Sequence, residues 1–349
     1  MQTPSDGTHQ TVLFLSDHTV ERTDGLAQRF FPLTKSPANP TFVKTEPWEG
    51  EGPYMPYVLW NPDTRQYQMW YGTYRFADNY YRWGYAVSRD GRAWEKPPLH
   101  LGTFLGKPAR NEIPASPHPD KACRSVVRDP RPDCPPERRY KGMRFTYEGI
   151  FVSFSPDGIH WTEYEGNPVW HVPSDSLFCM WDANRRKFVC YFKTWEIKGQ
   201  RIDPKQPNRQ EPFQVCAPFY EVKQRDDRTD FSGPTIIFHP EGQAVIQPLS
   251  FSLASQMQGQ DDGGGGMLRG MWTSKRIVCW AESDDFIHWQ HEQIVLRADE
   301  QDNPTANIQS LFVFHYGSYY LGILAMHDEQ GRFNPQLGFS HDGLKWHRP

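Results

Sequence analysis

One pattern, S-x-D-[GF]-x-x-W, recurs four times along the chain and constrains the fold more than any other feature. Its copies are residues 88–94, 155–161, 283–289 and 340–346. Each copy follows a short run rich in β-branched and aromatic residues, as residues 277–281 do. An Asp-Gly pair between two such runs is a strong hairpin signal, because glycine accepts a positive φ and aspartate bonds the turn backbone. The pattern therefore predicts four equivalent antiparallel turns whose acids close the turns.

A second unit, made of a strand, a polar turn and an aromatic strand, precedes each of these turns. The units cover residues 57–71, 125–145, 178–192 and 310–324. Each repeat then has four short antiparallel strands, A to D, which is the blade of a β-propeller. We predict an all-β, single-domain chain over residues 1–349: a β-propeller of the five-bladed type, with the fifth blade incomplete or built partly from the N-terminus. The expected blades are about 54–98, 120–168, 175–296 (with an insertion at 196–269) and 303–349, with closure strands at about 11–47.

Composition excludes several other classes. Aromatic residues make up 15% of the 349 residues and there are 31 prolines, which argues against a helical bundle and against disorder. A net charge of -4 gives no general attraction to nucleic acid, and no 18-residue apolar run suggests a membrane span. The polar residues 1–10 lack the features of a signal peptide, so we expect a cytoplasmic protein, or a secreted or periplasmic one if the N-terminus is incomplete.

No motif points to a metal or a cofactor. The six cysteines form no C-x-x-C pair, and Cys179, Cys190 and Cys279 lie in apolar runs where we expect them to be small core residues. The histidines form no H-x-x-H array, and no G-x-S-x-G nucleophile motif is present. The four glycines at 263–266 are followed by no GK[ST], so we expect a flexible surface loop in the insertion rather than a phosphate loop.

Propeller geometry separates a structural face from a functional one. In an up-and-down blade the A–B and C–D turns share one face. We therefore expect the acids of the repeated turns, and Asp129 of Arg128-Asp129-Pro130, to close turns and not to catalyse. The opposite face receives the starts of the inner strands, the B–C loops and the long insertion, and such loops usually carry binding sites. Residues expected on this face are Glu49, Glu51, Tyr54, Arg75, Asp78, Asp120, Arg124, Glu148, Asp175, Ser176, Lys193, Trp195, Glu196, Asp302, Asn307, His327 and Asp328.

Carboxylates that converge on a central funnel suit glycoside hydrolysis, in which one protonates the leaving oxygen while another attacks carbon or activates water. We predict Asp175 and Glu51 as the principal pair, with Asp120 or Glu196 as modulator or acid. The expected substrate-binding residues are Trp48, Tyr54, Arg75, Arg124, Lys193, Trp195, Asp302, Asn307 and His327. Any single acid has a simpler alternative role as a solvated rim residue or as the partner of Arg124 or Lys193 in a salt bridge.

Several segments resemble one group of bacterial proteins described as similar to glycoside hydrolase families 32, 43 and 68. They are residues 13–17 (LFLSD), 129–141 (DPRPDCPPERRYK), 155–161 (SPDGIHW), 175–176 with 178–182, 191–195 (YFKTW) and 283–289 (SDDFIHW). The resemblance implies a five-bladed propeller with an acidic funnel and activity on furanosides or related glycans. This sequence differs from the sucrose- and fructan-cleaving members in one motif. They carry W-x-N-D-P-x-G, whereas Trp48-Glu49-Gly50-Glu51 occupies the corresponding region here. Arg128-Asp129-Pro130 matches their R-D-P in letters but aligns with the A–B turns, so its role is not transferred.

Two other functions stay open beside hydrolysis. A non-catalytic carbohydrate-binding propeller would keep the aromatics without an acid pair, and a glycoside phosphorylase would need a basic phosphate pocket, which Arg124, Lys193 and Arg75 could form. A sialidase is disfavoured because no arginine triad can be read. We expect a carbohydrate substrate, no nucleic acid or membrane partner and no cofactor or metal; the oligomeric state stays open. With only four turn motifs, we also expect an incomplete or unusually closed propeller, as a truncated reading frame would give.

Overall fold

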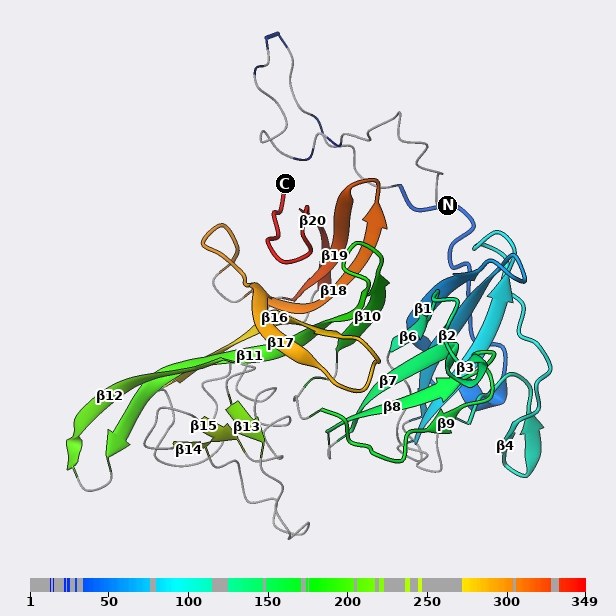
Figure 1. The fold of residues 1–349 in the computed structure, drawn as a ribbon, viewed down its shortest axis with the longest axis horizontal. Helices are drawn as coiled ribbons and strands as arrows, with labels where there is room; N and C mark the ends of the chain where they lie inside the picture. The colour runs from blue at the N-terminus through cyan, green and yellow to red at the C-terminus, as the bar shows by residue number, and fades with distance from the viewer. Residues whose placement is uncertain are drawn as a thin grey trace.

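A computed structural model shows an all-β protein built from several antiparallel sheets (Figure 1). It describes residues 34–75, 80–114, 125–146, 149–170, 174, 176–203, 206–216, 220–222, 236–238, 244–246, 272–303, 306–327 and 333–349, with 13, 15, 22, 24, 25 and 29 near the N-terminus. In these residues the helical elements are two short 3-10 helices, η2 (Pro47–Glu49) and η3 (Pro136–Arg138). No helix among them is long and apolar enough to cross a membrane.

Four sheets carry the repeat. The first sheet is β1 (Pro53–Asn61), β2 (Gln66–Arg75) and β3 (Tyr80–Ser88); the second is β6 (Ser125–Arg128), β7 (Tyr140–Thr146), β8 (Gly149–Ser155) and β9 (Thr162–Glu163). The third sheet contains β10 (Leu177–Asp182), β11 (Lys187–Asp203), β16 (Trp272–Ser283) and β17 (Gln290–Leu296), and the fourth contains β18 (Asn307–Tyr316), β19 (Tyr319–His327) and β20 (Phe333–Ser340). In the first and fourth sheets a single bridge, Val87 to Glu95 and Phe339 to His347, stands at the place of a fourth strand.

Part of the insertion forms strands rather than a loop. β11 continues to Asp203 and pairs with β12 (Gln206–Cys216), so the loop prediction is wrong for these segments. The four glycines at 263–266 lie outside the described residues. The sequence of β12 is polar and contains prolines, so it does not predict a strand. The strand forms through backbone pairing with β11. Figure 1 shows this hairpin extending away from the other sheets. Two small sheets complete the description: β4 (Gly102–Phe104) with β5 (Lys107–Ala109), and β13 (Tyr220–Val222), β14 (Ile236–Phe238) and β15 (Ala244–Ile246).

The repeated turns have the same hydrogen bonds in all four copies. In the second turn the Asp157 carboxylate accepts the backbone N–H groups of Ile159 and His160, each at 2.8 Å, and the Ser155 hydroxyl accepts that of Gly158 at 2.8 Å. Burial acts to raise the pKa of Asp157, but the hydrogen bonds from His160 and Ile159 outweigh it and hold the pKa below its usual value. The predicted turn chemistry is therefore confirmed, and these carboxylates are ionised structural acceptors.

Two of the turns also join their sheet to the preceding one. The Gly158 carbonyl accepts the Trp70 indole N–H of the first sheet at 2.7 Å, and the Gly343 carbonyl accepts the Tyr191 hydroxyl of the third at 2.9 Å. A Cβ at Gly158 would lie 2.6 Å from the Trp70 ring, so glycine is needed for this close approach as well as for its positive φ. The third turn has Phe286 instead, which is fully buried and packs on Phe188 at 5.4 Å.

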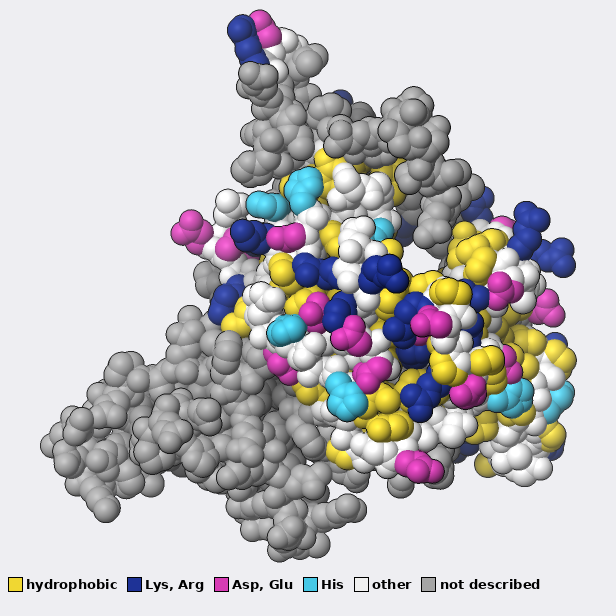
Figure 2. Space-filling view, in the orientation of Figure 1, with side chains coloured by type: hydrophobic (Ala, Val, Ile, Leu, Met, Phe, Trp, Pro, Cys, Tyr) yellow, Lys and Arg dark blue, Asp and Glu magenta, His cyan; other side chains and the backbone are white. Residues whose placement is uncertain are grey.

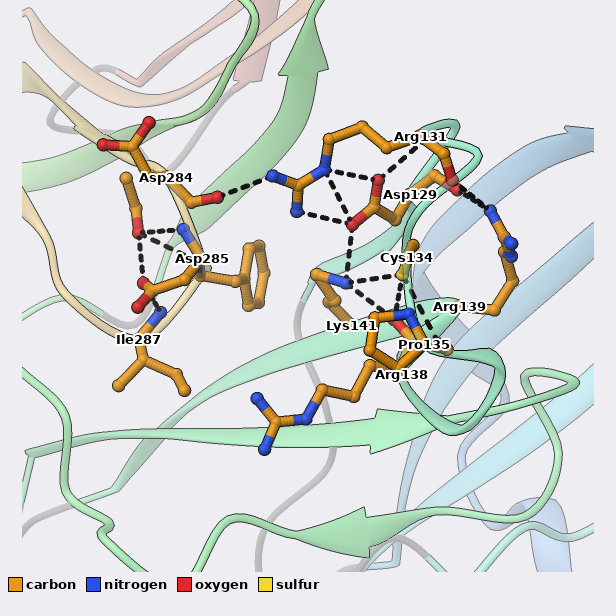
Figure 3. A network of polar contacts seen from close by, with 12 residues as sticks. Asp129, Arg131, Cys134, Pro135, Arg138, Arg139, Lys141, Asp284, Asp285 and Ile287 are labelled. Atoms are coloured by element: carbon orange, nitrogen blue, oxygen red, sulfur yellow. Dashed lines mark hydrogen bonds and ion pairs between the residues drawn. The ribbon is translucent and has the colours of Figure 1, made fainter.

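A buried ion network replaces this link at the third turn (Figure 3). The Arg131 guanidinium donates to both oxygens of the fully buried Asp129 and, at 3.0 Å, to the backbone carbonyl of Asp284 in the third sheet. The Lys141 ammonium lies 2.9 Å from the same Asp129 carboxylate. Burial acts to raise the pKa of Asp129, but the bonds from Arg131 and Lys141 outweigh it and hold the pKa far below its usual range. The network therefore clamps the second sheet to the third.

The core lies between consecutive sheets. Trp70 and Tyr140 pack between the first and second sheets, and Leu311 and Tyr191 pack between the third and fourth. Cys179, Cys190 and Cys279 are buried free thiols, and they belong to the cluster between the second and third sheets, which confirms the prediction for them. Each interface is apolar and continuous, so the turn links orient sheets that burial already holds together.

We predict that Asp129→Asn destabilises the fold by about 3–5 kcal/mol at pH 7, because it leaves Lys141 and Arg131 without their buried counter-charge. The depressed pKa gives stability that is fully present above the unfolded value of about 3.9 and is lost as pH falls below it. The difference between wild type and variant should therefore shrink in acid. Urea unfolding at several pH values measures it, with the exposed Asp133→Asn as control; equal midpoints for both variants at pH 7 would contradict the clamp.

Candidate functional site

The ends of the sheets opposite the repeated turns form the candidate site. The inner strands β1, β10 and β18 approach one another through aromatic side chains: the Phe178 ring lies 6.0 Å from that of Tyr57 and 5.6 Å from that of Phe312. The Tyr57 hydroxyl also donates to the backbone carbonyl of Leu177. These contacts hold the inner strands β1, β10 and β18 close to one another, on the side where the sequence predicts a funnel.

Several predicted residues lie outside the described residues. They are Asp175, Asp120, Arg124, Asp78, Glu148 and Asp328. For Trp195 and Glu196 the structure describes the backbone, which places them on β11 opposite Arg276 and Lys275 of β16. Burial lowers the pKa of the Lys275 ammonium. The predicted acid pair is therefore represented in the described residues by Glu51.

Glu51 is exposed and is positioned by the glycine before it. Gly50 has a φ of 57°, and a Cβ there would lie 2.4 Å from the carbonyl oxygen of Tyr74. This close approach lets the Glu51 backbone N–H donate to the same carbonyl at 3.0 Å. The end of β2 therefore fixes the backbone of Glu51 while its side chain stays in solvent.

Glu49 is a structural acid, although it lies only two residues away. Its fully buried carboxylate accepts the Lys96 ammonium at 2.6 Å, the Tyr71 hydroxyl at 2.7 Å and the Thr45 backbone N–H at 2.6 Å. Burial acts to raise the pKa of Glu49, but these hydrogen bonds outweigh it and hold the pKa below its usual value. Trp48 is also in the core, only 2% exposed and stacked on Tyr71, so its ring lies away from solvent.

Three tyrosines surround the end of the first sheet beside Glu51. The ring of Tyr81 lies 4.5 Å from that of Tyr74 and 6.4 Å from that of Tyr54. Gly72 makes room for Tyr54, because a Cβ on that glycine would lie 2.9 Å from the tyrosine ring. All three tyrosines are partly exposed. Partly exposed aromatic rings beside a carboxylate can pack against the apolar faces of a sugar.

A buried acid that the sequence analysis missed lies at the outer edge of this sheet. The Glu112 carboxylate accepts the Arg82 guanidinium at 2.5 Å, and its second oxygen occupies the space that a Cβ on Gly102 would take. Burial raises the pKa of Glu112, against the opposing effect of Arg82. Arg82 and Arg75 both lie over the Phe104 ring, at 5.1 and 4.8 Å. Neither Gly102 nor Glu112 lies in a sequence motif that predicts this contact, because the contact depends on long-range packing.

The third sheet holds the chain on both sides of position 175. The Lys193 backbone N–H donates to the Ser176 carbonyl at 3.0 Å, and the Ser174 hydroxyl donates to the same carbonyl at 2.9 Å. Lys193 itself is 2% exposed and Ser174 is buried. The residues on both sides of Asp175 are therefore anchored to β11. Lys193 is a predicted substrate-binding residue, but its side chain is buried.

The fourth sheet places its three predicted residues in structural contacts. The Asn307 side-chain oxygen accepts the Arg276 backbone N–H at 2.8 Å, which links the third and fourth sheets. His327 is the Cα partner of Asn307 and packs on Phe333 at 4.8 Å. Asp302 pairs with Arg348 at 2.7 Å, and although burial acts to raise the pKa of Asp302, that bond helps to hold it below its usual value. His327 keeps a partly exposed ring near the end of β19.

Neither the distribution of surface charge nor any cluster of metal-ligating side chains in the described residues points to a further site. Positive and negative side chains are interspersed over the described part of the face in Figure 2. Among the described residues, no group of three or more His, Cys, Asp or Glu side chains could hold a metal ion.

No family model and no curated protein match the chain. Among solved structures it is similar to a thermostable family-43 glycoside hydrolase, with 10% identity over 88% of this chain and 75% of that one and a TM-score of 0.46. It is also similar to a family-43 endo-arabinanase from Bacillus licheniformis (8% identity, 92% and 83% coverage, TM-score 0.41). A family-32 β-fructofuranosidase from Bombyx mori matches at 13% identity, with 89% of this chain, 52% of that one and a TM-score of 0.44.

We predict that Gly50→Ala destabilises the protein more than Gly52→Ala does. Both glycines have a positive φ, so each substitution carries a strain of about 1–3 kcal/mol. Only at Gly50 would the new Cβ also collide with Tyr74, since the nearest side chain to Gly52 is 4.0 Å away. Thermal unfolding of the two variants checks this, and equal losses would show that the contact with Tyr74 does not position Glu51.

Proposed function

We propose that this protein is a glycoside hydrolase-like enzyme that cleaves a glycosidic bond in an oligosaccharide or polysaccharide. Asp175 and Glu51 form the carboxylate pair, with Asp120 or Glu196 as acid or modulator. Protonation of the leaving oxygen by one carboxyl group and attack on carbon or activation of water by another is the chemistry that such a pair provides. Furanosides or related glycans are the substrate class that the family resemblance implies.

The observation that carries this proposal is the different state of the acids at the two ends of the sheets. At the turn end Asp157 and Asp285 accept two backbone N–H groups each, and Asp129 is neutralised by two cations. Their pKa values are lowered, so they cannot donate a proton near neutral pH. At the opposite end Glu51 is exposed beside three partly exposed tyrosines. This end is therefore the one that can bind a sugar and transfer a proton.

The proposal includes a propeller architecture of one domain. The four sheets follow one another in sequence, pack face to face through apolar clusters and present their inner strands to a common centre. These features support four blades of a five-position ring. The proposal assigns Asp175 and Glu196 to the same funnel as Glu51, because Ser176 directly precedes β10 and the backbone of β11 passes through position 196 at the end away from the turns.

The tyrosine cluster favours a second candidate function, a carbohydrate-binding propeller without catalysis. Tyr54, Tyr74 and Tyr81 supply stacking surfaces whether or not an acid pair is present. The two functions differ in what the acids do, so the same variants separate them.

We predict that Asp175→Asn and Glu51→Gln each lower kcat at least 100-fold, with binding changed much less, because general acid–base or nucleophilic catalysis is lost while the tyrosines remain. The measurement is cleavage of arabino- and fructo-oligosaccharides and a panel of aryl glycosides, with and without inorganic phosphate. Calorimetric binding to the same oligosaccharides is measured in parallel.

Matched controls lie at the turn end. Asp63→Asn and Glu95→Gln remove exposed carboxylates there and should leave cleavage unchanged. Binding without cleavage by wild type would favour the carbohydrate-binding module, and a strict need for phosphate would favour the phosphorylase. Full cleavage by both Asp175→Asn and Glu51→Gln would reject the assignment of the pair.

A further inference from the structure

Two buried cysteines face each other across neighbouring strands of the third sheet. Cys179 of β10 and Cys190 of β11 are direct partners in the antiparallel register, and both are free thiols. Their exposed fractions are 3% and 0%. The proposed glycosidase chemistry uses neither of them, and packing alone does not require sulfur at both positions, because other small apolar side chains fill such places. The pair is therefore a candidate for chemistry of its own.

The hydrogen bonds of β10 show that the two cysteines form a close pair. The Cys179 backbone N–H donates at 2.8 Å to the hydroxyl of Ser125 in the second sheet, so it points away from β11. Cys179 and Cys190 are therefore a non-hydrogen-bonded pair, in which the Cα atoms of antiparallel strands lie about 4.5 Å apart and the side chains approach closely. A disulfide spans Cα separations of about 4.4–6.8 Å. The register thus already supplies the spacing that the bond requires.

The two thiols are also in contact with each other. Burial raises the pKa of the Cys190 thiol well above its usual value, and its hydrogen bond with the Cys179 thiol raises it further. The Cys179 Sγ lies 3.5 Å from the Sδ of Met143 in the second sheet. Since the sulfur atoms are enclosed by the core and the thiolate form is scarce, oxidation in the folded protein is slow and is restricted to small oxidants.

A third buried thiol in the same sheet supplies an internal comparison. Cys279 of β16 has Phe192 as its Cα partner, while Ala281 is the partner of Cys190. Cys279 is therefore diagonal to Cys190, and diagonal neighbours on adjacent strands are about 7–8 Å apart. That separation exceeds the reach of a disulfide. Of these three thiols, Cys179 and Cys190 are the two with the spacing for a bond.

We propose that Cys179 and Cys190 form a dithiol–disulfide site that a peroxide oxidises and a thiol reductant restores. Peroxide first oxidises one thiol to a sulfenic acid and releases one molecule of water. The sulfur of the second thiol then attacks the sulfenic sulfur, and the sulfenic hydroxyl leaves with the thiol proton as a second molecule of water. The two sulfur atoms together lose two electrons, which reduce the O–O bond of the peroxide. The new S–S bond joins the inner strand β10 covalently to β11.

Peptide mapping of the full chain tests the site. The folded protein is treated with hydrogen peroxide, its remaining thiols are blocked with N-ethylmaleimide, and it is cut with trypsin, which cleaves after residues 185–187, between the two cysteines. The peptides that contain Cys179 and Cys190 should stay joined, two hydrogen atoms lighter than their sum, and should separate on reduction with dithiothreitol. The thermal midpoint should rise by roughly 2–6 °C in a change that dithiothreitol reverses.

Matched variants separate this site from general oxidation. Cys190→Ala removes one member of the pair and should abolish both the joined peptides and the reversible rise of the midpoint. Cys279→Ala removes a buried thiol of the same sheet and should keep both, and circular dichroism checks that each variant is folded before oxidation.

Three results would overturn the proposal, and none of them depends on glycan cleavage. The first is that Cys179 and Cys190 stay free in the folded wild type at every peroxide concentration that leaves it folded. The second is that the joined peptides contain Cys279. The third is that the bond forms only in urea-unfolded protein, because the register of the folded sheet would then not be its template.

Discussion

The glycine carbonyls of the second and fourth repeated turns are the acceptors on which the arrangement of the sheets depends. Each accepts a hydrogen bond from a side chain on the second strand of the preceding sheet, Trp70 to Gly158 and Tyr191 to Gly343. Apolar burial alone would hold the sheets together but would leave their relative tilt and height free, whereas a directed hydrogen bond at one end fixes both. Where Phe286 replaces glycine, Arg131 and Asp129 take over the same function with a buried ion network. Two different chemistries thus solve one geometric problem.

The acids at the two ends of the sheets have different environments, and this difference bears on where the proposed chemistry can occur. The acids at the turn end are ionised acceptors that hold backbone or cations, and they cannot serve as proton donors without loosening the sheets. The opposite end is linked by contacts of another kind, among them the hydrogen bond from the Arg276 backbone N–H to the Asn307 side chain, which joins the third and fourth sheets. On the proposed function, the turn acids that stabilise the fold and the acids that carry the chemistry lie at opposite ends of the same strands. Glu49 and Glu51 show the same separation on a smaller scale, because one neutralises Lys96 in the core and the other faces solvent.

The four turns, their aspartate hydrogen bonds and the buried cysteines could be predicted because each depends on a local pattern. The roles of Glu49, Trp48 and Lys193 could not, since the same letters fit a rim residue and a core residue, and long-range packing decides between them. The contact between Glu112 and Gly102 has no sequence signal at all. The β12 strand has no sequence signal of its own, because its residues lack the apolar alternation on which strand prediction relies, while its backbone pairs with β11. The predicted roles of Asp175, Asp120 and Arg124 stay predictions.

The central claim is that the end opposite the repeated turns binds the substrate. Hydrogen exchange of the full chain, followed by mass spectrometry with and without saturating arabino- or fructo-oligosaccharide, tests it directly. The account predicts slower exchange on binding in the segments around Glu51, the end of β2 and the start of β10, with unchanged exchange in the four turns. Protection confined to the turns, with none around Glu51, would contradict it.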